Sequence, residues 1–316
     1  MKKNEPAIQP GLKENKQQFG LLVLVNAFVG AMIGLERAVL PGLGKNVFGL
    51  DANAAILSFI IAFGITKAIS NYSVAKLSKR FNRKQILMAG WWAALPVPFL
   101  LMYADSWSWV IAANILLGIN QGLAWSSTVI MKVDIVGQKN RGLAMGINEF
   151  AGYLSVGLAS YLASSLASNY GYAYFPFIPG LFFAAAGVLV SAFLIKDTTH
   201  FVHAESAVSK IALLKNVWKD TTWRHKNISS VTLNGLVNNM NDAVVWGLLP
   251  VLLLQKDFSI QEIGIIAGIY PAVWGVMQLF TGKMGDVYCK KQIITMGMLT
   301  QAVAIVLLAV SSQFIL

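Results

Sequence analysis

Five charged residues lie inside long apolar stretches of this sequence, where an ion costs several kcal/mol unless it is paired or hydrated: Glu36, Arg37, Lys67, Glu149 and Asp242. Glu149 and Asp242 are expected to lie deepest in a membrane. A buried carboxyl group can bind and release a proton near physiological pH, so both are candidates for proton coupling. The alternative is that each carboxyl group is hydrogen-bonded to neighbouring helices and serves packing.

Glu36 and Arg37 are neighbours in the chain, and adjacent positions on a helix point about 100° apart. One of them is therefore expected to face a cavity while the other meets a neighbouring helix. The alternative is an ion pair, or extension of both side chains to the membrane interface. For Lys67, which lies near one end of its apolar stretch, extension to the lipid headgroups is the competing interpretation.

Polar and aromatic side chains recur at helical spacing around these charges. In one stretch Asn114, Gln121 and Trp125 share a face, and the run NNMNDAVVW surrounds Asp242 with amides. Such faces line water or substrate at mid-bilayer, although amides also hold membrane helices together. The predicted cavity residues are Asn26, Glu36, Arg37, Asn114, Gln121, Trp125, Asn238, Asn241, Trp246, Tyr270 and Trp274.

The elements that must position these residues are membrane-spanning helices. The chain is 56% hydrophobic and only 12% charged, and its apolar residues come in blocks rather than at amphipathic spacing. A helix rises about 1.5 Å per residue, so roughly 20 apolar residues cross a hydrocarbon core of about 30 Å. The sequence predicts an all-α polytopic membrane protein with nine spans, near 20–44, 52–72, 85–104, 108–131, 142–168, 174–195, 229–254, 262–281 and 292–316.

The basic residues predict how these spans are oriented in a cytoplasmic (inner) membrane. With the N-terminus inside, 21 of the 25 Lys and Arg residues, Lys132 among them, fall on the cytoplasmic side and two fall outside. This insertion signal, with attraction to anionic lipid, accounts for the net charge of +11 without a nucleic-acid partner. Residues 1–19 become a cytoplasmic tail, and 196–228 a cytoplasmic linker with room for a surface helix around 206–218.

A repeated loop divides the spans into two halves. AKLSKRFNRKQI, residues 75–86, aligns without gaps with GKMGDVYCKKQI, residues 282–293, and each copy follows the second span of its half. Parallel repeats of this kind are typical of membrane transporters. The predicted domains are a six-helix bundle over 20–195 and a partial three-helix bundle over 229–316.

Both copies resemble the loop motif G-x-L-x-D-R-x-G-R-K of the major facilitator superfamily. The residues that carry the resemblance are Leu77, Arg80, Arg83 and Lys84 in the first copy and Gly282, Asp286, Lys290 and Lys291 in the second. The first copy has Lys79 in place of the acid. The resemblance implies a gating role in which the acid clasps the opposite half, so Asp286 is expected at the amide end of the fifth span, beside Arg141; a solvated loop acid is the alternative.

The resemblance also implies twelve spans in two bundles of six, of which this sequence holds nine. A shortened reading frame or fragment lacking three spans is therefore expected, with the C-terminus outside. If so, the chain is either a transporter from a broken gene, an inactive remnant, or a subunit that needs a partner.

The function that the resemblance implies is secondary active transport of a small organic solute by alternating access. Proton-coupled efflux is favoured over proton-coupled uptake, although Gly118 replaces the Arg of the exporter pattern R-x-x-Q-G and Tyr153 replaces the Pro of a Gly-Pro pair. No nucleophile and base pair, phosphate loop or metal-ligand cluster is evident, so neither an enzyme, a cofactor nor a metal site is expected. The expected partners are a small-molecule substrate, protons and the lipid bilayer, with the chain a monomer.

Overall fold

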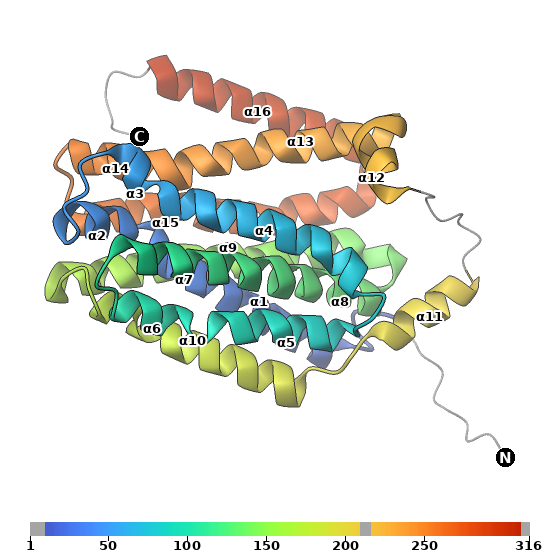
Figure 1. Cartoon of the computed structure of the whole chain (residues 1–316). Helices are drawn as coiled ribbons and strands as arrows, with labels where there is room; N and C mark the ends of the chain where they lie inside the picture. The colour runs from blue at the N-terminus through green and yellow to red at the C-terminus, as the bar shows by residue number, and fades with distance from the viewer. Residues whose placement is uncertain (1–9, 209–215, 311–316) are drawn as a thin grey trace.

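Long helices running side by side make up the molecule (Figure 1). The computed structural model describes residues 10–208 and 216–310, and every regular element in these ranges is helical. The fold class predicted from the sequence, an all-α polytopic membrane protein, is confirmed.

The helical segments of the described chain coincide with the predicted spans. Seven of them are long and apolar enough to cross a membrane: Lys16–Asn46, Asn53–Leu77, Arg83–Met102, Arg141–Tyr170, Phe175–Leu194, Lys226–Gln255 and Ile260–Val287. The fourth predicted span coincides with a helical run over 107–136, and the ninth with α16 (Lys290–Val310). The last residues of the ninth predicted span, 311–316, lie outside the described residues.

Several spans consist of two helices in succession. Those of the first half are α1 (Lys16–Arg37) with α2 (Leu40–Asn46), α3 (Asn53–Ile56) with α4 (Ser58–Leu77), α5 (Arg83–Ala94) with α6 (Val97–Met102), α7 (Trp107–Asn120) with α8 (Ser126–Val136), α9 (Arg141–Tyr170), and α10 (Ile178–Leu189). Those of the second half are α13 (Lys226–Ala243) with α14 (Leu249–Gln255), then α15 (Ile260–Val287) and α16. π-Helical turns over Gln121–Trp125 and Val244–Leu248 join α7 to α8 and α13 to α14.

Prolines and caps explain where several helices start. Pro41, Pro98 and Pro250 lie in the first turns of α2, α6 and α14, where a missing backbone N–H costs no helical hydrogen bond. Asn82 caps α5 and Ser259 caps α15, each in a reciprocal capping box with the residue three positions later.

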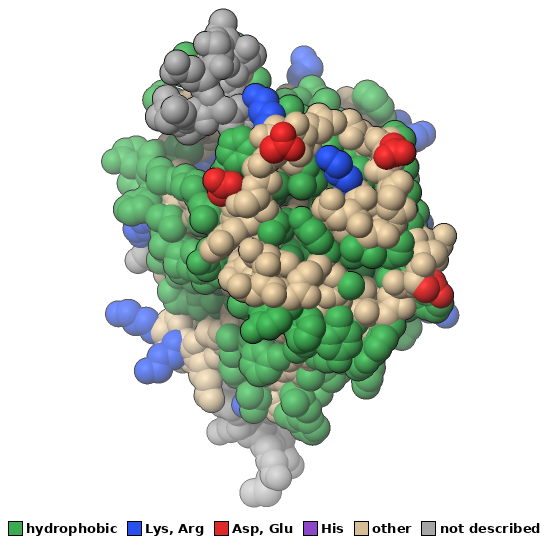
Figure 2. Space-filling model, turned by 90° about the vertical axis from the view of Figure 1, so that its left-hand side faces the viewer, with side chains coloured by type: hydrophobic (Ala, Val, Ile, Leu, Met, Phe, Trp, Pro, Cys, Tyr) green, Lys and Arg blue, Asp and Glu red, His purple; other side chains and the backbone are tan. Residues whose placement is uncertain are grey.

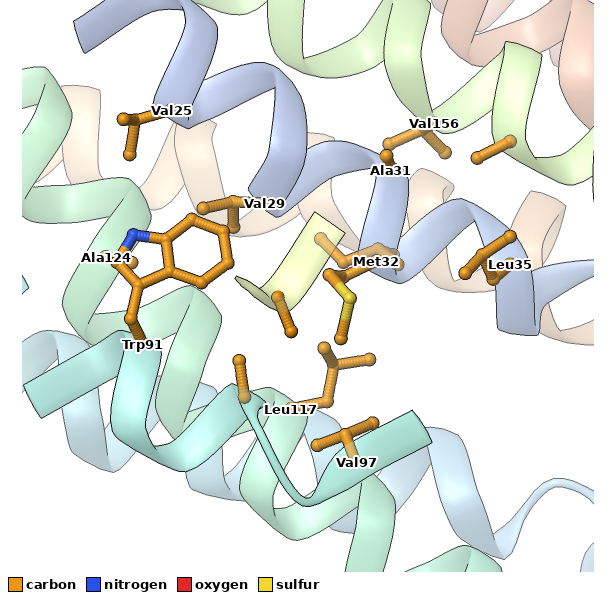
Figure 3. Close-up of a cluster of buried hydrophobic side chains, with 14 of the residues drawn as sticks. Val25, Val29, Ala31, Met32, Leu35, Trp91, Val97, Leu117, Ala124 and Val156 are labelled. Carbon is orange, nitrogen blue, oxygen red and sulfur yellow. The ribbon is translucent and has the colours of Figure 1, made fainter. Parts of the chain in front are cut away.

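The main hydrophobic core lies within the first half. Figure 3 shows part of it, with Trp91 from α5 and Leu117 from α7 facing Val29 and Met32 from α1. Trp91 is fully buried and packs where Gly187 of α10 presents no side chain. The Trp91 ring therefore occupies space that a side chain at position 187 would otherwise fill.

α9 and α15 pack against each other along most of their length. Gly142 lies opposite Gly282, and Gly157 lies opposite Gly268; a Cβ on any of these four would fall within 3 Å of backbone on the other helix. Small residues let membrane helices approach closely and gain dispersion contacts. This α9–α15 seam joins the two halves of the chain.

Two short helical segments lie in the linker, on either side of the part where most of the surface helix around 206–218 is predicted. α11 covers Thr199–Val208, and a short helical segment follows at Val217–Lys219, labelled α12, while 209–215 lies outside the described residues. The start of the linker is tied to the bundle: Thr198 Oγ1 donates to Asp134 Oδ2 (2.8 Å), and Asp197 accepts from the backbone N–H of Lys84 (3.2 Å) and of Thr199 (3.0 Å). These contacts fix the chain where it leaves the first half.

Different helices lie at the two ends of the bundle. Figure 2 looks onto the end at which α2 and α14 lie, where few acidic and basic side chains are scattered among hydrophobic and uncharged ones. α11 and α12 lie at the opposite end (Figure 1).

Candidate functional site

A cavity of about 400 Å³ opens between helices of the two halves. Its charged lining residues come from three helices: Arg37 from α1, Lys67 from α4 and Asp242 from α13. The other lining residues are Ile60, Phe63, Gly64, Ala68, Asn71, Leu236, Asn239 and Trp246. Its volume lies within the range of about 300–1,000 Å³ that is usual for small-molecule sites.

Arg37 is held in this cavity by aromatic rings. Only 2% of the residue is exposed, and the guanidinium carbon lies 4.4 Å from the centre of the Phe63 ring and 5.7 Å from that of Trp246. Nε and Nη1 have no hydrogen-bond partner, and no carboxylate within the described ranges lies at ion-pair distance from Arg37. Cation–π attraction is thus its main described interaction.

Glu36 points the other way, as the angle between adjacent helical positions predicts. It is buried in the first half, against Val97 and Pro98 on one side and Phe177 on the other. The Asn114 amide is a polar neighbour, but its Nδ2 donates to the Val110 carbonyl (3.1 Å) and neither Glu36 oxygen has a hydrogen-bond partner. Glu36 and Arg37 therefore form no ion pair, and neither reaches the interface.

Asp242 is oriented by a tyrosine of the neighbouring helix. The Tyr270 hydroxyl of α15 donates to Asp242 Oδ1 (2.7 Å) and accepts from Asn241 Nδ2 (3.1 Å). Asp242 itself is 6% exposed. The Asn-rich run thus supplies both a carboxylate on the cavity wall and the amide that fixes its hydrogen-bond partner.

Lys67 lies half-buried on the same wall. It repels Arg37 and attracts the carboxylates of Asp242 and Glu149. Lys67 therefore interacts electrostatically with the other charged residues of the cavity and with Glu149. Its place on the cavity wall argues against the competing interpretation, in which it extends to the headgroups.

Glu149 lies in α9 and does not line the cavity. Asn148 Nδ2 donates to its Oε1 (2.6 Å), and Trp125 lies beside it. Lys132 attracts it from α8; that lysine is fully buried, with Nζ donating to the Leu22 carbonyl (3.0 Å). Lys132, counted from the sequence among the cytoplasmic cations, is thus enclosed by helix packing.

Aromatic rings fill the space between the two carboxylates. Tyr153 is their centre: its ring lies 5.5 Å from Trp125, 6.0 Å from Trp246 and 5.5 Å from Trp274, and Trp274 lies 6.0 Å from Tyr270. We call Trp125, Tyr153, Trp246, Tyr270 and Trp274 the aromatic cluster. It connects four helical segments and places Glu149 on one side and Asp242 on the other.

The second loop motif joins the two halves at one end of the seam. Asp286 accepts hydrogen bonds from the backbone N–H of Gly142 (2.8 Å) and of Leu143 (2.9 Å), at the N-terminus of α9 beside Arg141. The predicted contact is present, and a helix N-terminus favours an anion. Lys290 and Lys291 of the same motif are exposed.

The first motif makes contacts within its own half instead. Arg83 Nε lies 3.6 Å from Asp134 Oδ2, and Lys84 Nζ donates to the Ala192 carbonyl (2.7 Å). Leu77 is partly buried and Arg80 is exposed. With Lys79 in place of an acid, this copy has no carboxylate to offer a helix N-terminus.

Comparison with known proteins decides the family. The family model of the Major Facilitator Superfamily matches residues 19–229 and 231–316, which is nearly the whole chain. The chain belongs to the major facilitator superfamily.

Individual superfamily members are more distant. The chain is 26% identical over 204 residues to the "Probable 4-methylmuconolactone transporter" of Cupriavidus pinatubonensis, covering 62% of this chain and 46% of that protein. The crystal structure of a D-xylose-proton symporter superposes with a TM-score of 0.54 at 16% identity, covering 83% of this chain and 66% of the symporter. The chain thus spans about half the length of the first relative, and the structural likeness shows the fold alone.

Some predicted cavity residues are packed inside the first half of this superfamily fold. Asn26 is fully buried, its Nδ2 donating to the Asn148 carbonyl (3.0 Å) and its Oδ1 accepting from Thr128 (2.9 Å). Asn114 is also fully buried, and Gln121 nearly so. These amides suit the alternative stated for them, in which they hold helices together.

The cavity also contains residues that sequence reasoning missed. Of the predicted cavity residues, Arg37 and Trp246 line it, as does the proton-coupling candidate Asp242, whereas Asn238, Asn241, Tyr270 and Trp274 do not. Asn71 lines it without having been predicted, Asn239 lines it but was predicted only as part of the Asn-rich run, and Tyr153 was noted only as a departure from a Gly-Pro pair. Asn239 lies in the same Asn-rich run as Asp242, so that run held the signal; nothing in the local sequence singles out Asn71.

Proposed function

We propose that this superfamily chain serves proton-coupled transport of a small organic solute by alternating access. The observation that carries the proposal is Asp242, a carboxylate that faces a cavity between the two halves and lies in a helical segment long and apolar enough to cross a membrane. A carboxyl group in such a place is costly unless it is used or paired, and protonation removes the cost. Its hydrogen bond from Tyr270 holds it toward one geometry.

Glu149 is the second proposed proton-binding group. It lies on the far side of the aromatic cluster, close enough to Lys67 and Lys132 for their charges to act on it. Because Lys67 also attracts Asp242, a change of charge at one carboxylate alters the field that the other experiences through a shared cation. This linkage supports coupling between the two proposed proton-binding groups.

The gating role of the loop motifs also belongs to the proposal. Asp286 closes one end of the α9–α15 seam through two charged hydrogen bonds, so opening that end requires them to break. We further propose that this end faces the cytoplasm, in a cytoplasmic membrane, with the N-terminus on the same side.

Efflux, with solute and proton moving in opposite directions, is the direction favoured by the sequence. Uptake is the second candidate, because the D-xylose-proton symporter shares the fold. Proteoliposomes distinguish the two: a pH gradient that drives solute in the same direction as protons indicates symport, and one that drives it the opposite way indicates exchange.

The test of coupling uses the purified full chain in liposomes that contain a pH-sensitive dye. Small organic acids, amides and alcohols are added singly, and proton movement is recorded. Asp242→Asn and Glu149→Gln are each expected to abolish the solute-dependent signal, whereas Asp51→Asn, at an exposed acid, leaves it unchanged. Coupling of wild-type size in Asp242→Asn and Glu149→Gln contradicts the proposal.

A further inference from the structure

The charges that face the cavity do not balance. Two cations, Arg37 and Lys67, and one acid, Asp242, line it. Asp242 attracts Lys67, whereas Arg37 has no acid at ion-pair distance within the described ranges. Glu36 attracts Arg37 electrostatically but forms no ion pair with it. A cation in a membrane-spanning helix that no anion contacts is costly, so Arg37 is suited to bind a negative group from outside the chain.

The guanidinium of Arg37 is available to such a group. Its Nε and Nη1 make no hydrogen bond although the residue is 2% exposed, and Glu36, its neighbour in the chain, points away into the first half. A guanidinium presents its donors as a planar fork that fits the two oxygens of a carboxylate. The ring of Phe63 holds that fork in place at 4.4 Å.

The rest of the cavity suits an apolar body. Ile60, Phe63 and Leu236 line it together with the Trp246 ring, and Asn71 and Asn239 supply the remaining polar side chains. A volume of about 400 Å³ is at the small end of the usual range for ligand sites. A solute with one charged end and a compact body matches both features.

We propose that the transported solute is a small organic monocarboxylate, which binds Arg37 through its carboxylate and rests its body against Phe63 and Trp246. This inference rests on the proposed transport function and names the substrate class of its cavity. Lys67 contributes a second, weaker attraction, because Asp242 already offsets its charge.

Matched acid and amide pairs test this assignment. Benzoate and benzamide, cyclohexanecarboxylate and its amide, and hexanoate and its amide are titrated into the full chain in nanodiscs of zwitterionic lipid, with tryptophan fluorescence as the signal. At least one acid is expected to bind about tenfold or more tightly than its amide, since a charged hydrogen-bonded pair is lost in the amide. If no acid exceeds its amide, the assignment is overturned.

Variants show which residue causes the preference for an acid over its amide. Arg37→Gln is expected to remove this preference. Lys67→Gln is expected to reduce it by about threefold, because Asp242 already offsets part of the Lys67 charge. Lys45→Gln removes an exposed cation elsewhere and leaves it unchanged. Because Arg37 makes no ion pair and loses mainly its cation–π contacts, Arg37→Gln is expected to fold with a melting temperature lowered by only a few degrees. If that variant does not fold, Lys67→Gln decides, and an undiminished preference there overturns the assignment.

Three further outcomes distinguish a solute carboxylate from a lipid headgroup, and this inference from the proposed transport function. Loss of acid binding when phosphatidylglycerol is added to the nanodiscs would show that a lipid headgroup occupies the site, and would overturn the assignment. Acid binding without any proton movement would leave the carboxylate site standing and contradict proton-coupled transport. Proton movement driven by amides but not by acids would support proton-coupled transport and overturn the carboxylate assignment.

Discussion

At the residue scale, two side chains that are neighbours in the chain have opposite surroundings. Arg37 reaches the cavity between the halves, whereas Glu36 is enclosed by α6 and α10 with their connecting segments. The rotation of about 100° per helical residue separates them. A single helix therefore presents a cation to the cavity while the acid beside it is buried in the first half.

A second residue-scale feature is Asp197, which lies just after α10 outside the membrane spans. Burial alone raises the pKa of this carboxyl group, but hydrogen bonds from the Thr199 hydroxyl and from the backbone N–H groups of Lys84 and Thr199, with His200 nearby, outweigh it and lower the pKa. A lowered folded-state pKa stabilises the fold above the unfolded-state pKa of about 3.9. That contribution is lost as the pH falls through the folded-state value.

Asp197→Asn is therefore expected to cost about 1 kcal/mol at pH 7, as loss of a partly exposed charged hydrogen bond does. The cost should shrink as the pH falls toward 4 and below, where wild type loses the same contribution. Thermal unfolding in detergent across this pH range measures it. Asp105→Asn, at an exposed acid, is the control, and a pH-independent cost would contradict the electrostatic explanation.

At the element scale, the α9–α15 seam combines close packing with one clasp. Glycine pairs bring the helices together, and Asp286 caps the N-terminus of α9 from α15. The first loop motif, which lacks the acid, instead holds its own half through Arg83 and Asp134. The two copies of one motif thus make different contacts: the second joins the two halves, and the first stays within its own half.

Asp286→Asn is expected to loosen the start of α9. Removal of the charge from two backbone hydrogen bonds lowers the free energy of opening the first turn of α9 by about 1–2 kcal/mol. That loss corresponds to roughly 5- to 30-fold faster amide exchange. Hydrogen exchange measured on peptides covering Gly142 and Leu143 tests this. Asp51→Asn, at an exposed acid in another loop, should leave the exchange rates of these amides unchanged. Unchanged exchange in Asp286→Asn would show that the hydrogen bonds of Asp286 do not stabilise the start of α9.

At the scale of the whole molecule, the proposed orientation predicts which end meets the cytoplasm. Cys289 lies between α15 and α16, exposed, at the end where α9 begins. Backbone N–H groups of Gln292 and Lys291, and then the charges of Lys291 and Lys290, lower the pKa of its thiol. A lowered pKa raises the fraction of reactive thiolate at neutral pH.

A membrane-impermeant maleimide is therefore expected to label Cys289 rapidly in inside-out vesicles and not in right-side-out vesicles. The rate should fall as the pH is lowered through the thiol pKa, because the thiolate is the nucleophile. The matched control is Cys289→Ser with Ser106→Cys, which moves the thiol to an exposed site at the other end and should reverse the pattern. Labelling of wild type only in right-side-out vesicles would contradict the orientation.

Length and composition determined the class of this protein. Twenty-residue apolar blocks are local features, so the positions of the spans, the repeated loop and the family resemblance could all be predicted before any helix was placed. The contact of Asp286 with α9 could also be anticipated, because the motif contains the acid and the family resemblance implies that it clasps the opposite half.

Only the tertiary structure decided which buried groups meet. Lys132 was counted as cytoplasmic, Asn26 was expected in the cavity, and Tyr153 was not proposed for the site at all, yet packing encloses the first two and places the third between Glu149 and Asp242. The physical reason is that membrane insertion depends on the hydrophobicity of each segment. The neighbours of a side chain depend instead on the rotation of its helix about its own axis relative to the other helices. That rotation is set by contacts between distant parts of the chain.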